Sequence, residues 1–563
     1  MPRKLVIAVI SGLVVAPSAQ ARPTQLMPAV TYERVLEWTA AGPVALHAIT
    51  APRPVGLYSL TPLLSNGTIT GLETVSSMQR TASPRLTTIG VNGDFFSYAG
   101  GWPSGLLIRA GVVEHQPVVG RAAAGIDTSG NLHLDRVPWY ATWRGPSTVV
   151  YPLAQLNELP RADSTALFTP VWGSRTPAIR GTAVVLEPFP LTVPRRDLTG
   201  DVKSIVTDQS VPIPRDGAVL VGRGAAAQYL LDEASVGPKL TLRIPLQTDW
   251  AQVTDAVSGG PTLVKNGRPI ANAGEALTPA QLRGRNPRTA VGQRADGGIV
   301  MLAVDGRRAG WSIGITNWDL ALALMRYGCV TGFALDSGGS TTVAFEGKVL
   351  NRPSDRGGER AVADALVVGY TGVFTPAPAP TLSPNADGAG DRETLSYKLV
   401  RPATVSARLI APDGSARELE AAQKAPGRYR LSWDGTDTIG ALAPEGVYHW
   451  NVTAVDDLGR TSTDDRSFRL DNTLGFLRVS PGARRIDFTL SRDANMRVTI
   501  ESPGGGVLRT VASGLRPAGP VTALWNGRDA RRKLFRQGTY AVRVTATSPI
   551  GLSVLRVPLR IVR

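Results

Sequence analysis

The sequence contains almost no cysteine or histidine. Of its 563 residues, one is cysteine (Cys329) and four are histidine. A single cysteine excludes a fold held together by internal disulfides, and we expect Cys329 to be a small buried core residue. The four histidines lie outside the glycine-rich motifs described below, which argues against a Ser-His-Asp hydrolase and against a histidine-rich zinc site.

Long apolar runs are also missing once the N-terminus is passed, so no later segment is expected to span a membrane. The first 21 residues combine the cations Arg3 and Lys4, an apolar stretch from Leu5 to Val15, and the small-residue sequence Ala19-Gln20-Ala21. This order of features is typical of a secretory signal peptide that is removed on export. We therefore expect a secreted protein, extracellular or associated with the cell wall.

Glycine and proline are abundant, at 60 and 43 residues. This composition predicts many short strands joined by turns, and hence an N-terminal α+β domain that is rich in strands and has few helices. The net charge is +16. In an intracellular protein such a charge suggests nucleic acid, but in an exported one we expect anionic envelope polymers as partners, and no nucleic acid.

A proline-alanine run divides the chain. Thr375-Pro376-Ala377-Pro378-Ala379-Pro380 is typical of a stiff linker. The sequence therefore predicts a signal peptide at 1–21, a large domain at 22–372, a linker at 373–380, and two small domains at 381–471 and 472–563. These lengths suit small β-sandwiches.

The two small domains are copies of one unit. Trp433-Asp434-Gly435 followed by Tyr448 returns as Trp525-Asn526-Gly527 followed by Tyr540, with the same spacing. The repeat resembles the Ig-like domain of flagellar hook-capping proteins, so we expect two all-β Ig-like sandwiches. The first copy opens with Asn385, Asp387 and Asp391 around a glycine, a pattern that suits either a Ca²⁺ loop or a plain Asx turn.

The large domain carries several glycine-punctuated motifs. They are Asn92-Gly93-Asp94, Ser258-Gly259-Gly260-Pro261, Arg288-Thr289-Ala290-Val291-Gly292, Asp336-Ser337-Gly338-Gly339-Ser340-Thr341 and Gly358-Glu359-Arg360. Two of them have earlier counterparts, because Ser104-Gly105 and an Arg-x-Ala-x-Gly element at 121–125 precede the matching pair at 258 and 288. We interpret this as a duplicated β-unit with the functional site between the copies.

Asp336 can be placed from its surroundings. A helix is expected to begin at Thr316, to present Trp318, Ala321, Leu322 and Met325 on one face, and to end at Gly328. A short buried strand from Thr331 to Leu335 then ends at Asp336. The small residues that follow form a turn whose backbone amides suit an anion.

Together these motifs resemble the phosphodiester glycosidase family over roughly residues 88–370, with a less recognisable stretch from about 136 to 250. The family's usual glycine after the aspartate is Ser337 here. The resemblance implies a hydrolase that cleaves a sugar-1-phosphodiester at the anomeric carbon. Because a phosphate monoester is a good leaving group, such a reaction needs a cationic clamp on the phosphate and a carboxylate on the sugar side more than a strong general acid.

We assign these roles as follows. Asp336 is the expected nucleophile or base, with Asp94 and Asp305 as alternates. The other expected site residues bind substrate: Asn92 as a sugar- or metal-facing amide, Arg288 and Arg360 as the phosphate clamp, and Ser258, Gly259, Gly338, Gly339, Ser340 and Thr341 around them.

Two other functions remain open from the sequence. Asp94, Asp305 and Asp336 could together hold Ca²⁺ or Mg²⁺ in a metal-dependent phosphodiesterase that cuts the P–O bond. The chain could also be a non-catalytic protein that binds cell-wall polymer through arginine-rich faces or its Ig-like modules.

Overall fold

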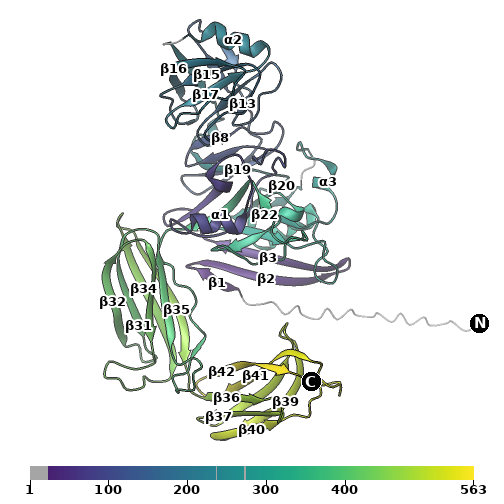
Figure 1. Ribbon diagram of the computed structural model, residues 1–563, viewed down its shortest axis with the longest axis vertical. Coiled ribbons are helices and arrows are strands. Elements are labelled where there is room, and N and C mark those ends of the chain that lie inside the picture. Colours follow the sequence, from purple (N-terminus) through teal and green to yellow (C-terminus); the bar gives the residue numbers. More distant parts are fainter. Residues whose placement is uncertain (1–22, 236–237, 272–273, 563) are drawn as a thin grey trace, which may run out of the picture. The chain divides into compact units, whose positions relative to one another are not determined.

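The computed structural model describes residues 23–235, 238–271 and 274–562 (Figure 1). The signal-peptide prediction for 1–21 lies outside these residues. The chain forms two compact units, one built mainly from Ala29–Tyr370 and the other mainly from Thr371–Arg563. Both consist largely of strands, as predicted. Within the described residues, no helix has the length and apolarity that a bilayer crossing requires.

Three antiparallel sheets form the core of the first unit. The first sheet has the order β1 (Thr24–Met27), β2 (Val30–Thr39), β3 (Gly42–Ala51), β23 (Ile299–Val304), β22 (Arg288–Arg294), β24 (Cys329–Ala334), β20 (Thr262–Lys265) and β21 (Arg268–Pro269). The second has the order β10 (Leu132–Asp135), β9 (Ala123–Asp127), β19 (Val253–Ser258), β7 (Leu107–Arg109) and β8 (Val112–His115). The third has the order β26 (Lys348–Val349), β25 (Val343–Phe345), β6 (Thr87–Asn92), β28 (Asp364–Tyr370) and β4 (Tyr58–Leu64). The short strands β5 (Glu73–Thr74) and β27 (Ala361–Val362) pair separately.

The first two sheets share one local arrangement. In the second sheet, the hairpins β7–β8 and β9–β10 lie on either side of β19. In the first sheet, the hairpins β20–β21 and β22–β23 lie on either side of β24 in the same order. This correspondence is what the predicted duplication requires. The central strands of the two arrangements end at Ser258 and Ala334, next to two of the glycine-rich motifs.

Four α-helices lie within the described part of the first unit: α1 (Val75–Ala82), α2 (Ala225–Glu233), α3 (Pro279–Leu282) and α4 (Asn317–Arg326). Short 3-10 turns occur at η1 (Ser65–Gly67), η2 (Thr248–Trp250) and η3 (Gly338–Ser340). Helix α4 begins as predicted, since the Thr316 hydroxyl accepts a hydrogen bond from the Asp319 amide. The predicted face is correct in part: Ala321 is buried and Met325 packs against the core, but Trp318 is 51% exposed and Leu322 is exposed too. The helix buries Leu320 and Leu324 against the sheet in their place.

The stretch from about 136 to 250 folds into a β-barrel. Its strands follow the order β12 (Val150–Pro152), β11 (Thr142–Arg144), β18 (Lys239–Arg243), β16 (Asp197–Thr207), β15 (Thr182–Leu186), β17 (Ala218–Gly222), β14 (Thr165–Phe168) and β13 (Gln155–Leu156). The barrel closes because β12 and β13 are consecutive: the Leu153 amide donates to Ala141 and the Ala154 amide to Thr165. Alternate strand residues such as Trp143 fill its interior.

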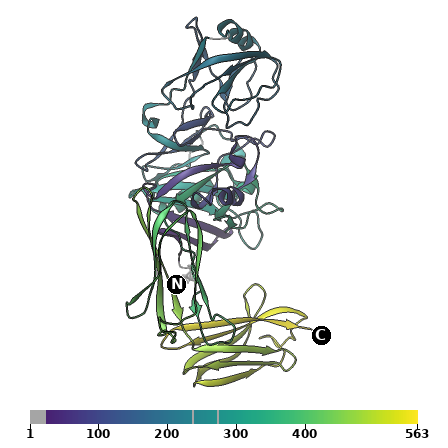
Figure 2. The same cartoon turned by 60° about the vertical axis from the view of Figure 1, so that its left-hand side comes forward.

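The second unit contains two β-sandwiches (Figure 2). The first is made of β29 (Thr381–Leu382), β35 (Thr461–Leu470), β34 (Gly446–Asp456), β31 (Ala403–Ile410) and β32 (Ala416–Lys424), with β30 (Glu393–Leu399) paired to β33 (Gly427–Trp433). The second is made of β36 (Leu474–Ser480), β37 (Arg485–Leu490) and β40 (Gly519–Leu524), with β39 (Val507–Arg516), β38 (Ala494–Glu501), β41 (Gly538–Thr547) and β42 (Leu552–Ile561). Alternating buried and exposed residues along the strands give each sandwich its own apolar core.

Two acidic features of the first sandwich have hydrogen-bond or ion-pair partners, one of which, the Phe476 amide, comes from β36. In the 385–391 loop, Asp391 accepts hydrogen bonds from three backbone amides and Asp387 accepts one from Ala389. This is the Asx-turn arrangement.

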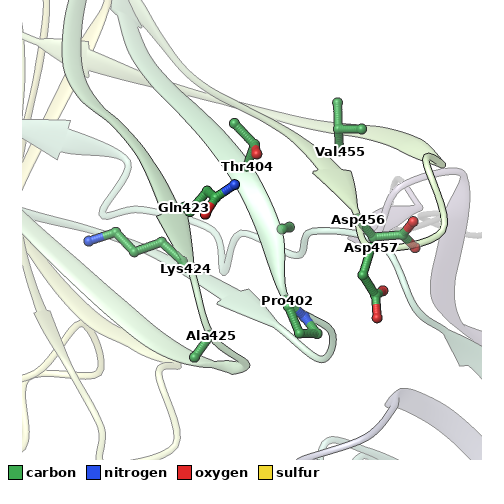
Figure 3. A pocket seen from close by; sticks show the side chains of 9 residues that line it. Pro402, Thr404, Gln423, Lys424, Ala425, Val455, Asp456 and Asp457 are labelled. Carbon is green, nitrogen blue, oxygen red and sulfur yellow. The ribbon is translucent and has the colours of Figure 1, made fainter.

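Elsewhere, Lys424 and Asp456 line a hollow of about 500 Å³ (Figure 3). The Asp456 carboxylate there is paired with Arg460 at 2.7 Å.

Candidate active site

Three aspartates from separate segments meet at the ends of strands. Asp94 follows β6, Asp336 follows β24, and Asp364 begins β28. Backbone hydrogen bonds join the three segments: the Asp336 amide donates to Gly93 at 2.9 Å, and the Gly93 amide donates to Asp364 at 3.0 Å. The Asp94 amide donates to the Asp364 side chain at 2.7 Å. The prediction that Asp94 and Asp336 lie together therefore agrees with the geometry.

Gly93 allows this close approach. A Cβ atom at this position would lie 2.0 Å from Oδ1 of Asp364. Its neighbour Asn92 is buried, and both ends of its side chain bond within the protein: Nδ2 donates to the Asp336 carbonyl at 2.9 Å, and Oδ1 accepts from Thr289 and Thr342. Asn92 is therefore not the sugar- or metal-facing amide that we expected. It fixes the backbone that carries Asp336.

Asp336 is held as an ionisable carboxylate. Its Oδ1 accepts a hydrogen bond from the Ser337 amide at 2.7 Å, and its Oδ2 accepts one from the Ser340 hydroxyl at 2.6 Å. Burial raises the pKa of Asp336 to about 6, against the opposing influence of these two hydrogen bonds. The side chain is therefore mostly ionised at neutral pH, at a pKa suited to acid–base or nucleophilic chemistry.

Arg121 and Asp364 complete the acidic cluster. Arg121 lies 3.2 Å from Asp94, and its guanidinium partly offsets the burial that raises the pKa of Asp94. Burial and the nearby Asp94 charge raise the pKa of Asp364 well above its ordinary value. Oδ2 of Asp364 is buried and has no hydrogen-bond partner among the described residues. The protonated form of Asp364 is therefore favoured more than in an ordinary aspartate.

Arg360 reaches Asp336 through Ser340. Its guanidinium forms two hydrogen bonds to Asp355, at 2.8 and 3.0 Å, and donates to the Tyr98 hydroxyl at 2.7 Å. Its Nη1 also approaches Oγ of Ser340 at 3.4 Å. Gly339 lies against this ion pair, because a Cβ there would lie 1.9 Å from the guanidinium. Of the two predicted clamp arginines, Arg360 is the one that lies beside Asp336.

Arg288 is placed elsewhere, which corrects our expectation. Its side chain is buried, and its guanidinium donates to four backbone carbonyls, those of Ile315, Gln281, Arg283 and Gly284. Those hydrogen bonds occupy the group that a phosphate would need. Arg288 therefore stabilises the loops next to β22 and does not form a clamp with Arg360.

Asp305 is also separate from the acidic cluster. Its carboxylate accepts hydrogen bonds from Trp311 at 2.8 Å and from Asn351 at 3.0 Å, and lies 3.2 Å from Nε2 of His47. Burial raises the pKa of Asp305, but the His47 hydrogen bond and its other donors outweigh it, so the pKa is lowered. Both carboxylate oxygens are used, so the predicted metal site of Asp94, Asp305 and Asp336 is not assembled. Among the described residues, no three His, Cys, Asp or Glu side chains are grouped so that they could hold a metal ion.

The other predicted binding residues are buried around the cluster. Ser258 accepts a hydrogen bond from the Leu106 amide at 2.9 Å, and the Gly338 amide donates to Pro287 at 2.9 Å. A Cβ on Gly259 would lie 2.6 Å from the Ala334 carbonyl. These contacts of the three residues hold the strands and turns around the cluster together. The Thr341 hydroxyl differs, since it is buried without a hydrogen-bond partner within the described chain.

Four residues of the cluster were not predicted: Tyr98, Arg121, Asp355 and Asp364. Arg121 had a signal, because it begins the Arg-x-Ala-x-Gly element that corresponds to Arg288. Asp355 lies shortly before Gly358-Glu359-Arg360. Tyr98 and Asp364 belong to no recurring motif.

Two sequence-family models match the chain. The model described as phosphodiester glycosidase matches residues 198–369, and the FlgD Ig-like domain model matches residues 478–549. The resemblances inferred from the sequence are thereby confirmed. A prophage-derived uncharacterized protein of Bacillus subtilis, YomE, is 44% identical over 108 residues, which are 19% of this chain and 16% of that protein. The match thus spans under a fifth of that relative's length.

Three solved structures are similar to parts of this chain. A hypothetical protein from Synechocystis is 22% identical, with a TM-score of 0.51 over 61% of this chain and 62% of that one, which indicates a common fold. A putative exported protein of Burkholderia pseudomallei is 21% identical over 58% of this chain and 74% of that one, with a TM-score of 0.46. The zebrafish N-acetylglucosamine-1-phosphodiester alpha-N-acetylglucosaminidase catalytic domain is 13% identical over 62% and 86%, with a TM-score of 0.32.

Proposed function

We propose that the first unit is a hydrolase that cleaves a glycosyl phosphodiester in an extracellular or envelope glycan. The observation that carries this proposal is the meeting of Asp336 and Arg360 at Ser340. An ionised carboxylate and a guanidinium one hydroxyl apart are the two groups that this reaction needs. The phosphodiester glycosidase match at 198–369 includes both of them.

In the proposed reaction the bond between the anomeric carbon and the phosphate oxygen breaks, and its electron pair leaves with the phosphate monoester. The new bond to carbon comes from water, whose proton Asp336 accepts, or from Asp336 itself in a first step that water then completes. Arg360 offsets the charge that develops on the leaving phosphate.

The surroundings of Arg360 suit this role. Asp355 holds the planar guanidinium through two hydrogen bonds, which fixes its orientation. The contact of Arg360 with Ser340 is long, at 3.4 Å, so this side of the guanidinium can turn to a phosphate oxygen at little cost. Ser340 then keeps its short hydrogen bond to Asp336.

Tyr98 is the proposed contact for the sugar or its aglycone. Its side chain is 71% exposed, although its hydroxyl is held by Arg360 and its ring packs against Phe96 at 4.8 Å. An exposed aromatic ring with a fixed position offers an apolar face to a sugar ring. Asp94, Arg121 and Asp364 surround Asp336 on its buried side. We assign to them the adjustment of the pKa of Asp336.

Hydrolysis in ¹⁸O-labelled water tests the proposal. With a sugar-1-phosphodiester as substrate, we expect the label in the released sugar, unchanged activity in the presence of a chelator, and loss of turnover in Asp336→Asn. Label in the phosphate would instead indicate a phosphodiesterase that cuts the P–O bond. Binding of the substrate without turnover by the wild-type protein would favour a polymer-binding protein.

A further inference from the structure

The second sandwich exposes a cluster of cations on one hairpin, between Trp525 and Gly538. The cluster consists of Arg528, Arg531, Arg532, Lys533 and Arg536, all of them exposed. Among the described residues, none of these five side chains forms a salt bridge with a carboxylate. We call this segment the cationic hairpin.

The corresponding hairpin of the first sandwich has the same backbone. In the first copy the Asp437 amide donates to Ala441 and the Ala443 amide donates to Gly435, and in the second copy Asp529 to Lys533 and Phe535 to Gly527 do the same. The bridges Thr436↔Leu442 and Arg528↔Leu534 also correspond. The two hairpins therefore differ in side chains and not in shape.

Their charges are opposite. At the positions of the five cations, the first copy has Thr436, Ile439, Gly440, Ala441 and Pro444, and its only charged residues there are Asp434, Asp437 and Glu445. Because the same fold is built without any of these cations, none of them is needed for the hairpin to form. Formation of the hairpin therefore does not explain why the second copy carries five cations.

The position of Arg532 supports this conclusion. It adopts φ 63°, whereas the corresponding Gly440 adopts φ 84°. A left-handed conformation is unfavourable for a residue with a side chain, so the second copy keeps an arginine at a position where glycine is better suited. Two further arginines lie next to the turn: Arg484 donates to the Asn526 carbonyl at 3.3 Å, and Arg509 donates to the Asp529 carbonyl at 3.4 Å.

We propose that the cationic hairpin binds a phosphodiester-linked polyol or sugar polymer, and so holds the protein on a polyanionic surface. Guanidinium groups that no carboxylate occupies bind phosphate well. That of Arg528 donates to the Arg532 carbonyl at 2.8 Å, which uses one of its five N–H groups. A single-stranded nucleic acid fits less well, because its binding sites normally offer exposed aromatic rings for the bases. Here Phe535 packs edge-on between Trp525 and Tyr540. This inference does not rest on the proposed hydrolysis.

The test uses the full-length chain and immobilised poly(glycerol phosphate), which has no anomeric carbon and so cannot be a substrate for glycosidic cleavage. Five phosphate contacts predict a slope of about −3.5 for log affinity against log salt, which is a loss of about 100-fold between 50 and 200 mM salt. A variant that takes four first-copy residues, Arg528→Thr, Arg532→Gly, Lys533→Ala and Arg536→Pro, should lose about 10-fold or more in affinity and most of this slope.

A matched control removes four exposed arginines of the same sandwich outside the hairpin, with Arg478→Thr, Arg497→Thr, Arg516→Ser and Arg560→Ser. It should bind like the wild type. An equal loss in both variants would show that net charge alone attracts the polymer, and would overturn the proposal. Absence of binding by the wild type, or tighter binding of single-stranded DNA with the same number of phosphates, would overturn it as well.

A gain-of-function variant keeps the proposal testable if the first variant does not fold. Thr436→Arg, Ile439→Arg, Ala441→Lys and Pro444→Arg place four cations on the first copy, where Gly440 is retained. We expect tighter binding and a steeper salt dependence than in the wild type. Unchanged binding by a folded variant would contradict the inference that the hairpin's cations form the site.

Discussion

Replacing Ser340 with alanine should move the acidic limb of the pH–rate profile to higher pH. The Ser340 hydroxyl donates a 2.6 Å hydrogen bond to Asp336, whose pKa burial raises to about 6. Losing a hydrogen bond to a charged group costs about 1.5–3 kcal/mol. Since one pKa unit corresponds to about 1.4 kcal/mol, the pKa of Asp336 should rise by about one to two units.

The measurement is kcat/KM for a sugar-1-phosphodiester between pH 5 and 9, with the released sugar quantified. Activity requires ionised Asp336, so the wild-type rate should rise through a midpoint near its pKa of about 6. The midpoint in Ser340→Ala should lie about one to two units higher. Thr342→Val is the control, because the Thr342 hydroxyl is buried without a partner in the described residues. If the acidic midpoint of the Ser340→Ala profile were unchanged or lay at lower pH than in the wild type, the assignment of Asp336 would be refuted.

Four other substitutions test the site and the structure around it. Asp336→Asn should reduce turnover by about 100-fold or more. In urea unfolding at pH 7.5 the variant should also be more stable than the wild type, by up to about 3 kcal/mol. The reason is that the raised pKa of Asp336 makes the wild-type fold lose stability as the pH rises from about 4 to about 6. Near pH 4 the two proteins should therefore be equally stable. Gly93→Ala places a methyl 2.0 Å from a carboxylate oxygen and should destabilise by about 1–3 kcal/mol, whereas Gly357→Ala, in open space, should be neutral in the same assay. Arg288→Lys should lower the melting temperature and Arg360→Lys chiefly the activity; the reverse pattern in paired thermal melts and rate assays would contradict their assignments.

Local sequence was sufficient to place Asp336. The helix start at Thr316, the left-handed Gly328 and the apolar run that follows locate the end of β24 without reference to any other part of the chain. The strand-rich fold followed from the abundance of glycine and proline. Each of these predictions depends on neighbouring residues, which is why the sequence could support it.

Neighbouring residues could not show which of the two corresponding arginines, Arg121 or Arg288, lies at the acidic cluster. Arg121 and Arg288 begin the same short motif in the two copies of the β-unit. In one copy the side chain reaches Asp94, and in the other it turns to the carbonyls of the 281–284 loop. Asp94 is remote from Arg121 in sequence, whereas most of the carbonyls that hold Arg288 belong to the segment just before it. Which partner each arginine reaches depends on the fold around it and not on the motif. Asp364 was missed for the same reason, since only the pairing of β28 with β6 brings it to Asp94.

The partly wrong face predicted for α4 has a related cause. Trp318 and Leu322 fit the helical spacing of a buried face, but the sheet beneath the helix contacts the side that carries Leu320 and Leu324. Helical periodicity identifies an apolar stripe. When apolar residues occur on more than one side, only the position of the sheet decides which side is covered.

Because Asp364 lies near the end of its unit, the ribosome adds it after the other aspartates of the cluster. The strand that it begins, β28, is the last strand of its unit and pairs with β4 and β6, which lie far earlier in the sequence. A nascent or truncated polypeptide that stops before this strand has Asp94 and Asp336 but cannot seal the sheet that positions them. The acidic cluster is therefore completed late, and such long-range pairing is slow to form.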